Sequence, residues 1–456
     1  MSTHTAPQHH ATDDEPPAAH DAGHAAHAPQ DAPTAVAPYA FAQEIRHAVT
    51  GGLFADTLTR KLYATDASIY EIDPMGAVFP RDGDEVAALH RLAFAHRVPV
   101  IPRGGGSGLA GEALGRAVVY DTTRHLDCIT EICPEENWVR AECGVVLDVL
   151  NAALAPFGKK LGPDPASGSR CVVGGVLAYN ATGAHSLYYG HFREHILEMD
   201  CVLANGERIT TRPVELDGPV WRDITGRDTL EAAVYKGTRR LCEEHARLIH
   251  DRWPHKLNRH RSGYLMYGVV RDGMIDLSRL ICGSEGTLAT ILSAKLRVVD
   301  IPARRGLLLL FYPTTIAAAR SVGAILAHKP YACELLDHNI VSMARAAGFG
   351  YEKYLPEHVG ALLMVEFEAA DAAGVEEKIA RCHDDIVTRR GMAIGSDTAT
   401  DDEKQRAYWA IRKSGEPLLY TKYHDRHPVG FIEDTSVDPH RLHEYLEGKD
   451  RIFAKY

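Results

Sequence analysis

Long apolar runs and clusters of positive charge are both scarce in this sequence of 456 residues. The apolar run that stands out covers residues 307–312, well short of the roughly 18 residues that a membrane helix needs. Lys and Arg form no cluster and the net charge is -11, which argues against general nucleic-acid binding. We therefore expect a soluble, cytoplasmic protein without an integral membrane segment, while peripheral docking on a membrane surface stays open.

Close pairs of cysteines are also missing, although the chain contains nine cysteines. Zinc and iron-sulfur sites usually take their ligands from such pairs, so no metal site is expected. No signal peptide is recognisable, which favours a reducing cytosolic compartment in which small buried thiols persist.

Two common nucleotide-binding patterns are absent as well. The sequence contains no Gly-Lys-Ser or Gly-Lys-Thr, which the phosphate loop of ATPases requires. Its glycine-rich segment at 103–111 runs soon into another predicted strand instead of a long helix, and no acidic ribose ligand is obvious after it. Ordinary ATP and NAD binding are therefore disfavoured.

The length predicts two or three domains. Residues 1–38 are rich in Ala, His, Pro and Asp and hold few large apolar side chains, so they are expected to form a disordered tail, with weak nickel or zinc binding as the alternative. A helical segment at 39–73 is expected to lead into a first domain at 74–301, and a second domain is expected at 302–456.

Hydrophobic periodicity predicts a mixed α+β first domain and a second domain of alternating strands and helices. Strands are expected at 78–80, 98–101, 117–120, 129–132, 138–142, 201–204, 289–299, 306–312 and 361–368. Helices are expected after a cap at Asp82 or Asp84 and at 146–157, 315–327 and 374–389. An Asn-Gly turn at 205–206 indicates a hairpin.

Three segments concentrate glycine and small polar residues, namely 103–111, 162–183 and 281–288. The first holds five glycines in nine residues, which permit positive φ and close approach of backbone N–H groups to an anion such as a diphosphate. Each segment alone would also suit a plain connector or a glycine-rich core crossing. Three of them in one chain favour the binding of a large ligand.

In order, these segments read Pro-Arg-Gly-Gly-Gly-Ser-Gly-Leu-Ala-Gly, Gly-Pro-Asp-Pro-Ala-Ser with Gly-Gly and Asn-Ala-Thr-Gly, and Gly-Ser-Glu-Gly-Thr-Leu. This order resembles the PCMH-type FAD-binding domain of vanillyl-alcohol-oxidase flavoproteins, in particular their D-lactate, glycolate and D-2-hydroxyglutarate dehydrogenase branch. The resemblance covers residues 60–440. It implies a two-subdomain α+β FAD-binding domain followed by an α/β FAD-linked oxidase C-terminal domain that carries the substrate side.

The resemblance also implies which residues contact FAD. They are Arg103, Gly104, Gly105, Gly106, Ser107 and Gly108 around the diphosphate, Pro163, Asp164, Ser167, Gly174, Gly175, Asn180 and Gly183 along the cofactor, and Gly283, Glu285, Gly286 and Thr287 on its other side. Family members that attach the flavin covalently use a His or Cys in these loops. Because Ser107 stands in the first loop, noncovalent FAD is expected.

The segment Tyr-Trp-Ala-Ile-Arg-Lys-Ser-Gly at 408–415 resembles the helix whose arginine holds the substrate carboxylate, which transfers that role to Arg412. A guanidinium suits a planar carboxylate because its fork makes two parallel hydrogen bonds. A solvated helical arginine is the alternative. The later segment 431–437 resembles a strand of longer relatives, in which Glu433 and Asp434 rank low as site residues.

The sequence departs from this branch after residue 437. It lacks the His-x-His and Gly-Asp-Gly-Asn segments that supply metal ligands and a base, and the cysteine-rich iron-sulfur modules of longer relatives. His424, His427, His440 and His443 lack that context. A C-terminally truncated chain or a fragment is therefore expected.

We expect oxidation of a small D-2-hydroxy acid with electrons passed to a quinone or an iron-sulfur partner. A flavin-binding subunit without turnover of its own, which needs a partner to supply the missing parts, is the first alternative. An enzyme of the same fold with another substrate, such as an alkyl-glycerone-phosphate synthase or a sugar-nucleotide reductase, is the second. A glycine-rich scaffold without flavin is the third.

Overall fold

The computed structural model describes residues 37–456 except 256, 258, 261, 348–350 and 423–434. These residues belong to one compact unit that begins at Ala35. Nearly all of the predicted tail lies outside the described residues, as do His424, His427, Glu433 and Asp434. Among the residues described, no helix combines the length and apolar character that a membrane span requires.

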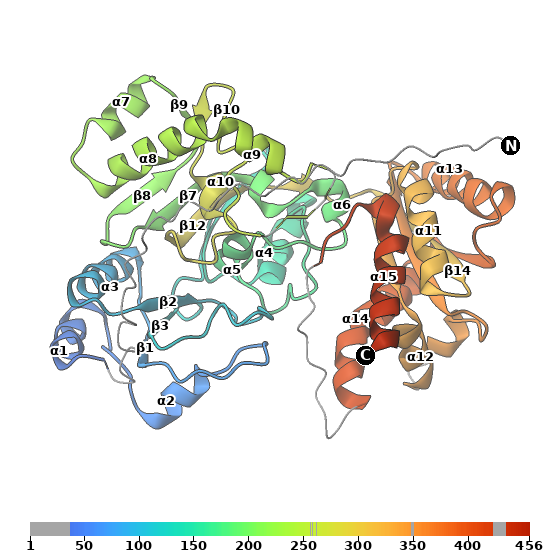
Figure 1. Ribbon diagram of the computed structural model, residues 1–456, viewed down its shortest axis with the longest axis horizontal. Coiled ribbons are helices and arrows are strands. Elements are labelled where there is room, and N and C mark those ends of the chain that lie inside the picture. The colour runs from blue at the N-terminus through green and yellow to red at the C-terminus, as the bar shows by residue number, and fades with distance from the viewer. Residues whose placement is uncertain (1–36, 256, 258, 261, 348–350, 423–434) are drawn as a thin grey trace, which may run out of the picture. The chain divides into compact units, whose positions relative to one another are not determined.

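The N-terminal part of the unit is a small parallel sheet with helices around it (Figure 1). Its strands pair in the order β1-β3-β2. The elements are α1 (Tyr39–Ala48), α2 (Thr57–Leu62), β1 (Gly76–Val78), α3 (Gly83–His96), β2 (Val100–Arg103) and β3 (Val118–Asp121). Asp82 caps α3 because its carboxylate accepts hydrogen bonds from the backbone N–H groups of Asp84 and Glu85, both at 2.9 Å. This decides between the two predicted caps.

Two predicted strands are shifted by proline. The strand expected at 78–80 ends at Val78, before Pro80, which has no N–H to donate to a ladder. The strand expected to end before Pro102 instead continues through it to Arg103. Because β2 is an edge strand, the missing N–H of Pro102 costs no pairing on its free side.

A five-stranded antiparallel sheet follows, in the order β4-β5-β12-β7-β8. Its strands are β4 (Ile129–Cys133), β5 (Trp138–Glu142), β7 (Ile196–Val202), β8 (Arg208–Thr211) and β12 (Thr290–Arg297). The hairpin predicted around the Asn-Gly turn is confirmed, because Val202 pairs with Arg208. Helices α4 (Leu147–Leu154) and α5 (Val173–Tyr179) supply Leu150 and Val176 to the core that includes Met199 of this sheet.

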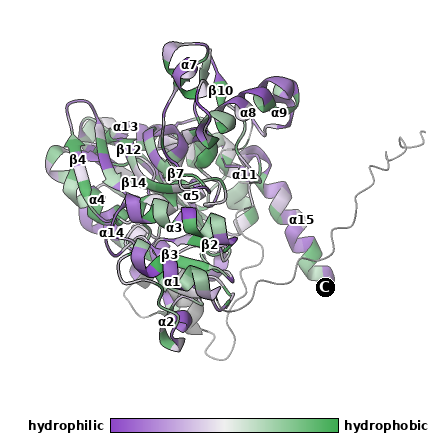
Figure 2. Ribbon diagram, turned by 90° about the vertical axis from the view of Figure 1, so that its left-hand side faces the viewer, coloured by the Kyte–Doolittle hydropathy of each residue, from purple (hydrophilic) through white to green (hydrophobic). Residues whose placement is uncertain are grey.

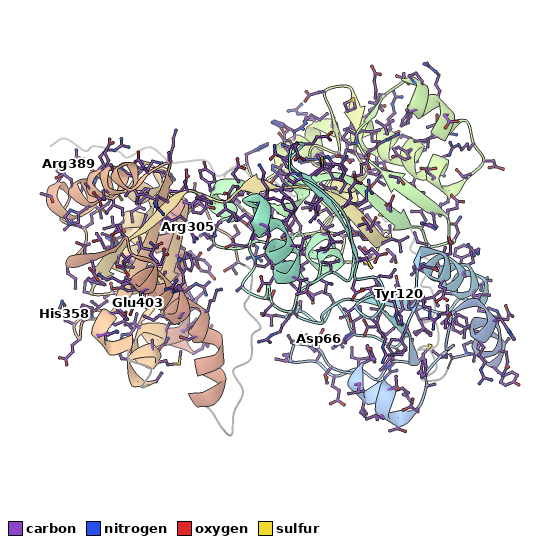
Figure 3. The ribbon with its side chains drawn as sticks, turned by 180° about the vertical axis from the view of Figure 1, so that it is seen from behind. Asp66, Tyr120, Arg305, His358, Arg389 and Glu403 are labelled. Carbon is purple, nitrogen blue, oxygen red and sulfur yellow. The ribbon has the colours of Figure 1, made fainter. Side chains whose placement is uncertain are left out.

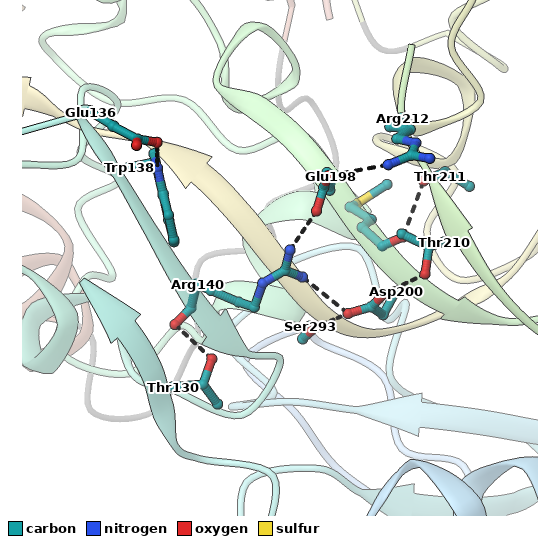
Figure 4. Close-up of polar contacts among 11 residues, drawn as sticks. Thr130, Glu136, Trp138, Arg140, Glu198, Asp200, Thr210, Thr211, Arg212 and Ser293 are labelled. Carbon is teal, nitrogen blue, oxygen red and sulfur yellow. Dashed lines mark hydrogen bonds and ion pairs between the residues drawn. The ribbon is translucent and has the colours of Figure 1, made fainter. Parts of the chain in front are cut away.

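The opposite face of this sheet is polar (Figure 4). Arg140 on β5 forms ion pairs with Glu198 and Asp200 on β7, the second at 3.2 Å. Ser293 on β12 donates a hydrogen bond of 2.6 Å to Asp200. Three neighbouring strands are thus tied on one face by charge and on the other by apolar packing, which is the alternation expected for a sheet buried on one side.

A region that the sequence patterns did not predict lies between β8 and β12. It contains a three-stranded antiparallel sheet in the order β10-β11-β9, with its own apolar core. Its elements are β9 (Val214–Glu215), α7 (Pro219–Thr225), α8 (Leu230–Glu244), α9 (Ala246–Arg252), β10 (Val270–Arg271), β11 (Met274–Ile275) and α10 (Ser278–Ile281). Strands of two residues are too short for periodicity to reveal.

Short elements complete this half of the chain. They are η1 (Ala155–Phe157), β6 (Lys159–Lys160), α6 (Ser186–Tyr189), η2 (Phe192–Glu194) and β13 (Val299–Asp300). Strands β6 and β13 pair antiparallel.

The C-terminal part is a four-stranded antiparallel sheet in the order β15-β16-β14-β17, with helices on both faces. Its strands are β14 (Arg304–Tyr312), β15 (Ala332–Leu336), β16 (Ala361–Ala369) and β17 (Gly395–Ala399). Its helices are α11 (Thr315–Leu326), α12 (His338–Ala346), α13 (Ala372–His383), α14 (Asp402–Lys422) and α15 (Leu442–Lys455), with short turns η3 (Tyr351–Tyr354), η4 (Asp384–Arg389) and η5 (Pro439–Arg441).

The apolar run at 307–312 is confirmed as the buried strand β14. Leu308 and Leu310 pack in the core that includes α11 and α13, whereas Leu307 and Leu309 pack in the core that includes α12 and α14. A strand covered on both faces needs no polar alternation, which explains the continuous run. In contrast, α15 shows alternating purple and green segments in Figure 2, as expected of a helix with one apolar face.

We predict that Leu310→Ala lowers the free energy of unfolding by about 3 kcal/mol, because Leu310 is fully buried and the change leaves a cavity. Ile452→Ala in the same part of the chain should change it by less than about 0.5 kcal/mol, because Ile452 is 59% exposed. Urea unfolding followed by circular dichroism measures both, and equal losses in the two variants would contradict the burial pattern.

Candidate functional site

The first glycine-rich segment begins where β2 ends and is packed against the second segment through its backbone. A Cβ atom on Gly104 would lie 2.4 Å from Cγ2 of Val172, and one on Gly105 would lie 2.1 Å from the carbonyl oxygen of Arg170. Neither distance is possible for a real side chain. The two segments therefore approach closely because these positions are glycine.

The third segment closes the arrangement from the other side. The N–H of Gly283 donates to Leu177 O at 3.0 Å, and the N–H of Glu285 donates to Ala178 O at 2.9 Å, which ties the segment to α5. A Cβ on Gly286 would lie 3.1 Å from Pro102, next to the first segment. The tertiary structure thus brings all three predicted loops together.

Positive φ angles shape the third loop. Gly283, Glu285 and Gly286 have φ values of 83°, 54° and 76°. A left-handed conformation is easy for the two glycines but uncommon for glutamate, so Glu285 is held there by its neighbours. Thr287 donates from Oγ1 to Ser284 O at 2.6 Å and completes this turn.

Within the second segment, Asp164 and Gly183 meet. A Cβ on Gly183 would lie 2.0 Å from the carbonyl oxygen of Asp164. Asn180 ends α5 in a left-handed conformation, and its Oδ1 accepts a hydrogen bond of 3.1 Å from the N–H of Arg193. Its side chain therefore supports the loop from within the protein. Other predicted positions lie on the same elements: Gly106, Ser107 and Gly108 on the first loop, Pro163 and Ser167 on the second, and Gly174 and Gly175 in α5.

Polar atoms around the loops lack partners within the described structure. Nη2 of Arg103 donates to Thr65 O at 2.7 Å, but its Nη1 is buried without a hydrogen bond. Oγ of Ser284 in the third loop is also buried and unpaired. Buried donors without partners cost free energy, so a ligand that accepts hydrogen bonds here would stabilise the site.

Arg412 lies on α14 in the C-terminal part and is partly exposed. Its Nε donates a hydrogen bond of 2.6 Å to Glu334 on β15. This contact fixes the orientation of the guanidinium and does not use its two terminal nitrogens. Those nitrogens form the fork that can bind a carboxylate through two hydrogen bonds.

The link between the loops and the arginine helix is a group that sequence reasoning missed. Nδ1 of His185, two residues after Gly183, lies 2.5 Å from the carboxylate of Asp164, and its Nε2 lies 2.6 Å from that of Glu366 on β16. Trp409 of α14 donates from Nε1 to the other oxygen of Glu366 at 3.3 Å. A chain of contacts therefore runs from the second glycine segment to the turn of α14 that precedes Arg412.

Burial opposes a charge on His185, but its hydrogen bonds to Asp164 and Glu366 outweigh burial and raise the pKa of His185. Glu366 itself is completely buried. A signal for this group was present in the sequence, because Glu366 interrupts the otherwise apolar stretch 361–367 of β16. Buried carboxylates require a charged or hydrogen-bonding partner.

Two protein families match separate parts of the chain. The family described as FAD binding domain matches residues 74–212 and thus two of the three glycine segments. The family described as FAD linked oxidases, C-terminal domain, matches residues 301–456 and thus the helix with Arg412. The chain therefore combines an FAD binding domain with the C-terminal domain of FAD linked oxidases.

Relatives of this chain carry the names of 2-hydroxy-acid enzymes. D-2-hydroxyglutarate dehydrogenase of Pseudomonas putida is 34% identical over 407 residues, and that of Escherichia coli is 32% identical over 412 residues. Each alignment covers 87% of this chain and 40% of the relative. Glycolate oxidase subunit GlcD of Bacillus subtilis is 27% identical, with 87% of this chain and 72% of the relative covered. The chain spans about 40% of the length of the dehydrogenases.

Solved structures show the same fold. An alkyldihydroxyacetonephosphate synthase superposes with a TM-score of 0.61 at 20% sequence identity, covering 87% of this chain and 68% of that protein. The predicted combination of an FAD-binding domain and an FAD-linked oxidase C-terminal domain is confirmed. The predicted boundaries between the domains, and the roles of individual residues, stay predictions.

The loop residues fit FAD on the evidence of their geometry. The diphosphate of FAD is an anion that accepts hydrogen bonds, and Arg103 Nη1 and Ser284 Oγ are buried donors in need of an acceptor. Glycine at positions 104 and 105 keeps side chains out of the loop that would approach it.

We predict that Gly105→Ala weakens FAD binding about tenfold or more, because its Cβ would force the first loop away from Arg170. Gly237→Ala in α8 is the matched control, because a Cβ there meets no atom within 4 Å, and FAD binding should not change. Flavin absorbance during titration with FAD measures both. Wild-type affinity in a folded Gly105→Ala variant would remove the first loop from the cofactor site.

Proposed function

We propose that this chain is the flavin-carrying part of a dehydrogenase that oxidises a small D-2-hydroxy acid to the 2-oxo acid. The observation that carries the proposal is the continuous contact from the glycine loops through Asp164, His185 and Glu366 to the helix of Arg412. It connects the segment expected along the flavin with the residue expected on the substrate.

FAD would be held noncovalently by the three loops. Gly104, Gly105, Gly106, Ser107 and Gly108 would present backbone N–H groups to its diphosphate, with Arg103 supplying positive charge. The residues along its length would be Pro163, Asp164, Ser167, Gly174, Gly175, Asn180, Gly183, Gly283, Glu285, Gly286 and Thr287. When bound, FAD supplies a ring that accepts a hydride, and the protein supplies position and electrostatics.

Arg412 would bind and orient the substrate carboxylate. Glu334 holds Nε of the guanidinium, so the terminal nitrogens are presented in a fixed direction. Fixing the carboxylate restricts rotation of the hydroxy acid and thereby lowers the entropic part of the barrier.

The substrates that the relatives suggest are D-2-hydroxyglutarate, glycolate and D-lactate, because these acids occur in the names of relatives. The acceptor in this proposal is a quinone or an iron-sulfur protein instead of NAD, and the location is the cytoplasm. These acids share the 2-hydroxy-carboxylate group and differ in their side chains. One experiment that adds them in turn therefore distinguishes between them.

The test is an absorbance spectrum of the purified chain, followed by anaerobic addition of D-2-hydroxyglutarate, D-lactate and glycolate in turn. We expect a flavin spectrum that one of the three acids bleaches, because reduction of the ring removes its visible absorbance. A flavin that none of them reduces would favour a binding subunit without turnover of its own. A chain that binds no FAD would contradict the proposal altogether.

We predict that Arg412→Ala raises the dissociation constant of the hydroxy acid roughly 30-fold, about 2 kcal/mol, because charge-assisted hydrogen bonds to the carboxylate are lost. FAD binding should be unchanged. Arg406→Ala on the same helix is the control, because Arg406 is exposed and its loss should leave substrate titration unaffected. An Arg412→Ala variant that titrates like the wild type would remove Arg412 from the site.

A further inference from the structure

His185 stands where two parts of the chain meet, and it touches a carboxylate of each. Asp164 belongs to the second glycine segment and Glu366 belongs to the sheet of the C-terminal part. His185 is 6% exposed and Glu366 is fully buried, so water cannot replace Glu366, whereas the side chain of Asp164 is 36% exposed. The two contacts, at 2.5 Å and 2.6 Å, are at least as close as charge-assisted N–H···O hydrogen bonds, which usually measure about 2.7–2.9 Å.

The two carboxylates beside the ring of His185 determine how many N–H groups the ring needs. A neutral imidazole has one N–H, whereas an imidazolium has two. Because both ring nitrogens face carboxylates, a neutral His185 would leave one nitrogen lone pair against a carboxylate lone pair. Only the protonated ring satisfies Asp164 and Glu366 together while both are ionised.

The contacts continue from Glu366 to the substrate side. Glu366 accepts a hydrogen bond from Trp409, whose ring centre lies 5.7 Å from that of His185. Arg412 follows Trp409 by three residues and therefore lies on the same side of α14. A shift of Glu366 would move the turn of α14 that presents Arg412.

We propose that protonated His185 is a positioning residue, which holds the Asp164 segment against β16 and thereby sets the position of Arg412. The proposal rests on the function proposed above for Arg412, but the contact itself does not. Loss of the proton would release one of the two carboxylates. Alignment between the cofactor loop and the arginine helix would then depend on pH.

Other charged and titratable groups surround this contact. Tyr331 packs its ring 4.4 Å from His185, centre to centre, and its hydroxyl bonds to Tyr189, while Tyr188 packs against both tyrosines. Lys160 lies over the rings of Tyr189 and Tyr331. Arg305, labelled in Figure 3, approaches Glu366 at 3.8 Å. Burial raises the pKa of both Tyr189 and Tyr331, so these hydroxyls stay neutral where His185 titrates.

The sign of the pH effect follows from the raised pKa of His185. Its stabilisation of the contact is fully present below the pKa of an unfolded histidine, about 6.5, and is lost as the pH rises through the raised value. The contact should therefore weaken on the alkaline side. Burial lowers the pKa of Lys160, so this ammonium group can also lose its proton on the alkaline side, and the His185→Gln variant separates its effect from that of His185.

The fluorescence of Trp409 tests the contact without turnover, because a protonated imidazole quenches a nearby indole more strongly than a neutral one. The emission of Trp409 is obtained by subtracting the emission of the Trp409→Phe variant from that of the full chain. Both are measured at pH values from about 5 to about 10. We expect it to rise with pH, with a midpoint above about 6.5. The same difference is taken between the His185→Gln variant and the double variant His185→Gln, Trp409→Phe. Without His185, the emission of Trp409 should not change stepwise with pH.

The variant Glu366→Gln provides a second test, through the pH midpoint of the Trp409 emission. Glutamine keeps an oxygen that can accept from Trp409 but removes one of the two charges that hold the proton, so the midpoint should fall by about one pH unit or more. His90→Gln is the control, because His90 is equally buried but bonds to Tyr120 and Thr290 instead of carboxylates. Its substitution should leave the Trp409 midpoint unchanged.

The positioning role has its own readout. The KM of the hydroxy acid should rise through the same midpoint in the wild type and lose that step in His185→Gln. A step in Trp409 emission that persists in His185→Gln, an unmoved midpoint in Glu366→Gln, or no step at all would overturn the proposal. Absence of turnover with every acid would instead refute the proposed function, and the fluorescence result would stand by itself.

Discussion

The close approach of the backbone at Gly104, Gly105 and Gly183 to neighbouring parts of the chain is the constraint on which the candidate site depends. At each position a Cβ atom would lie within 2.4 Å of another heavy atom, so no other residue fits without movement of the chain. Two loops far apart in the sequence can share one site only because these side chains are missing. The third loop adds its backbone hydrogen bonds to α5 and leaves Oγ of Ser284 buried without a hydrogen bond.

In the C-terminal part, a buried charge brings distant segments together. Glu366 interrupts an apolar strand, where an unpaired carboxylate would be costly, and the partners that compensate it come from elsewhere in the fold. His185 comes from the FAD-binding half and Trp409 from α14. The requirement to satisfy one carboxylate thus connects three elements that are distant in sequence. Apolar packing of β14 on both faces keeps that sheet in place around it.

Elements with strong local patterns were predicted well, and elements decided by pairing were not. The run at 307–312 became β14, and the Asn-Gly turn became a hairpin, because both signals act over a few residues. Pro102 was expected to end its strand, yet it lies inside β2 because that strand is at a sheet edge. Whether a strand lies at the edge or in the centre of a sheet depends on how all the strands pair. It cannot be predicted from the sequence of one strand.

The sequence alone determined the glycine loops, their order and the resemblance to the FAD-linked oxidases, because backbone freedom at a glycine is a local property. It also singled out Arg412 through the residues beside it. Only the tertiary structure decided that the three loops meet, that Glu334 orients Arg412, and that His185 joins Asp164 to Glu366. Those contacts span up to 181 residues of chain, and a hydrogen bond between distant side chains exists only once the fold has brought them together.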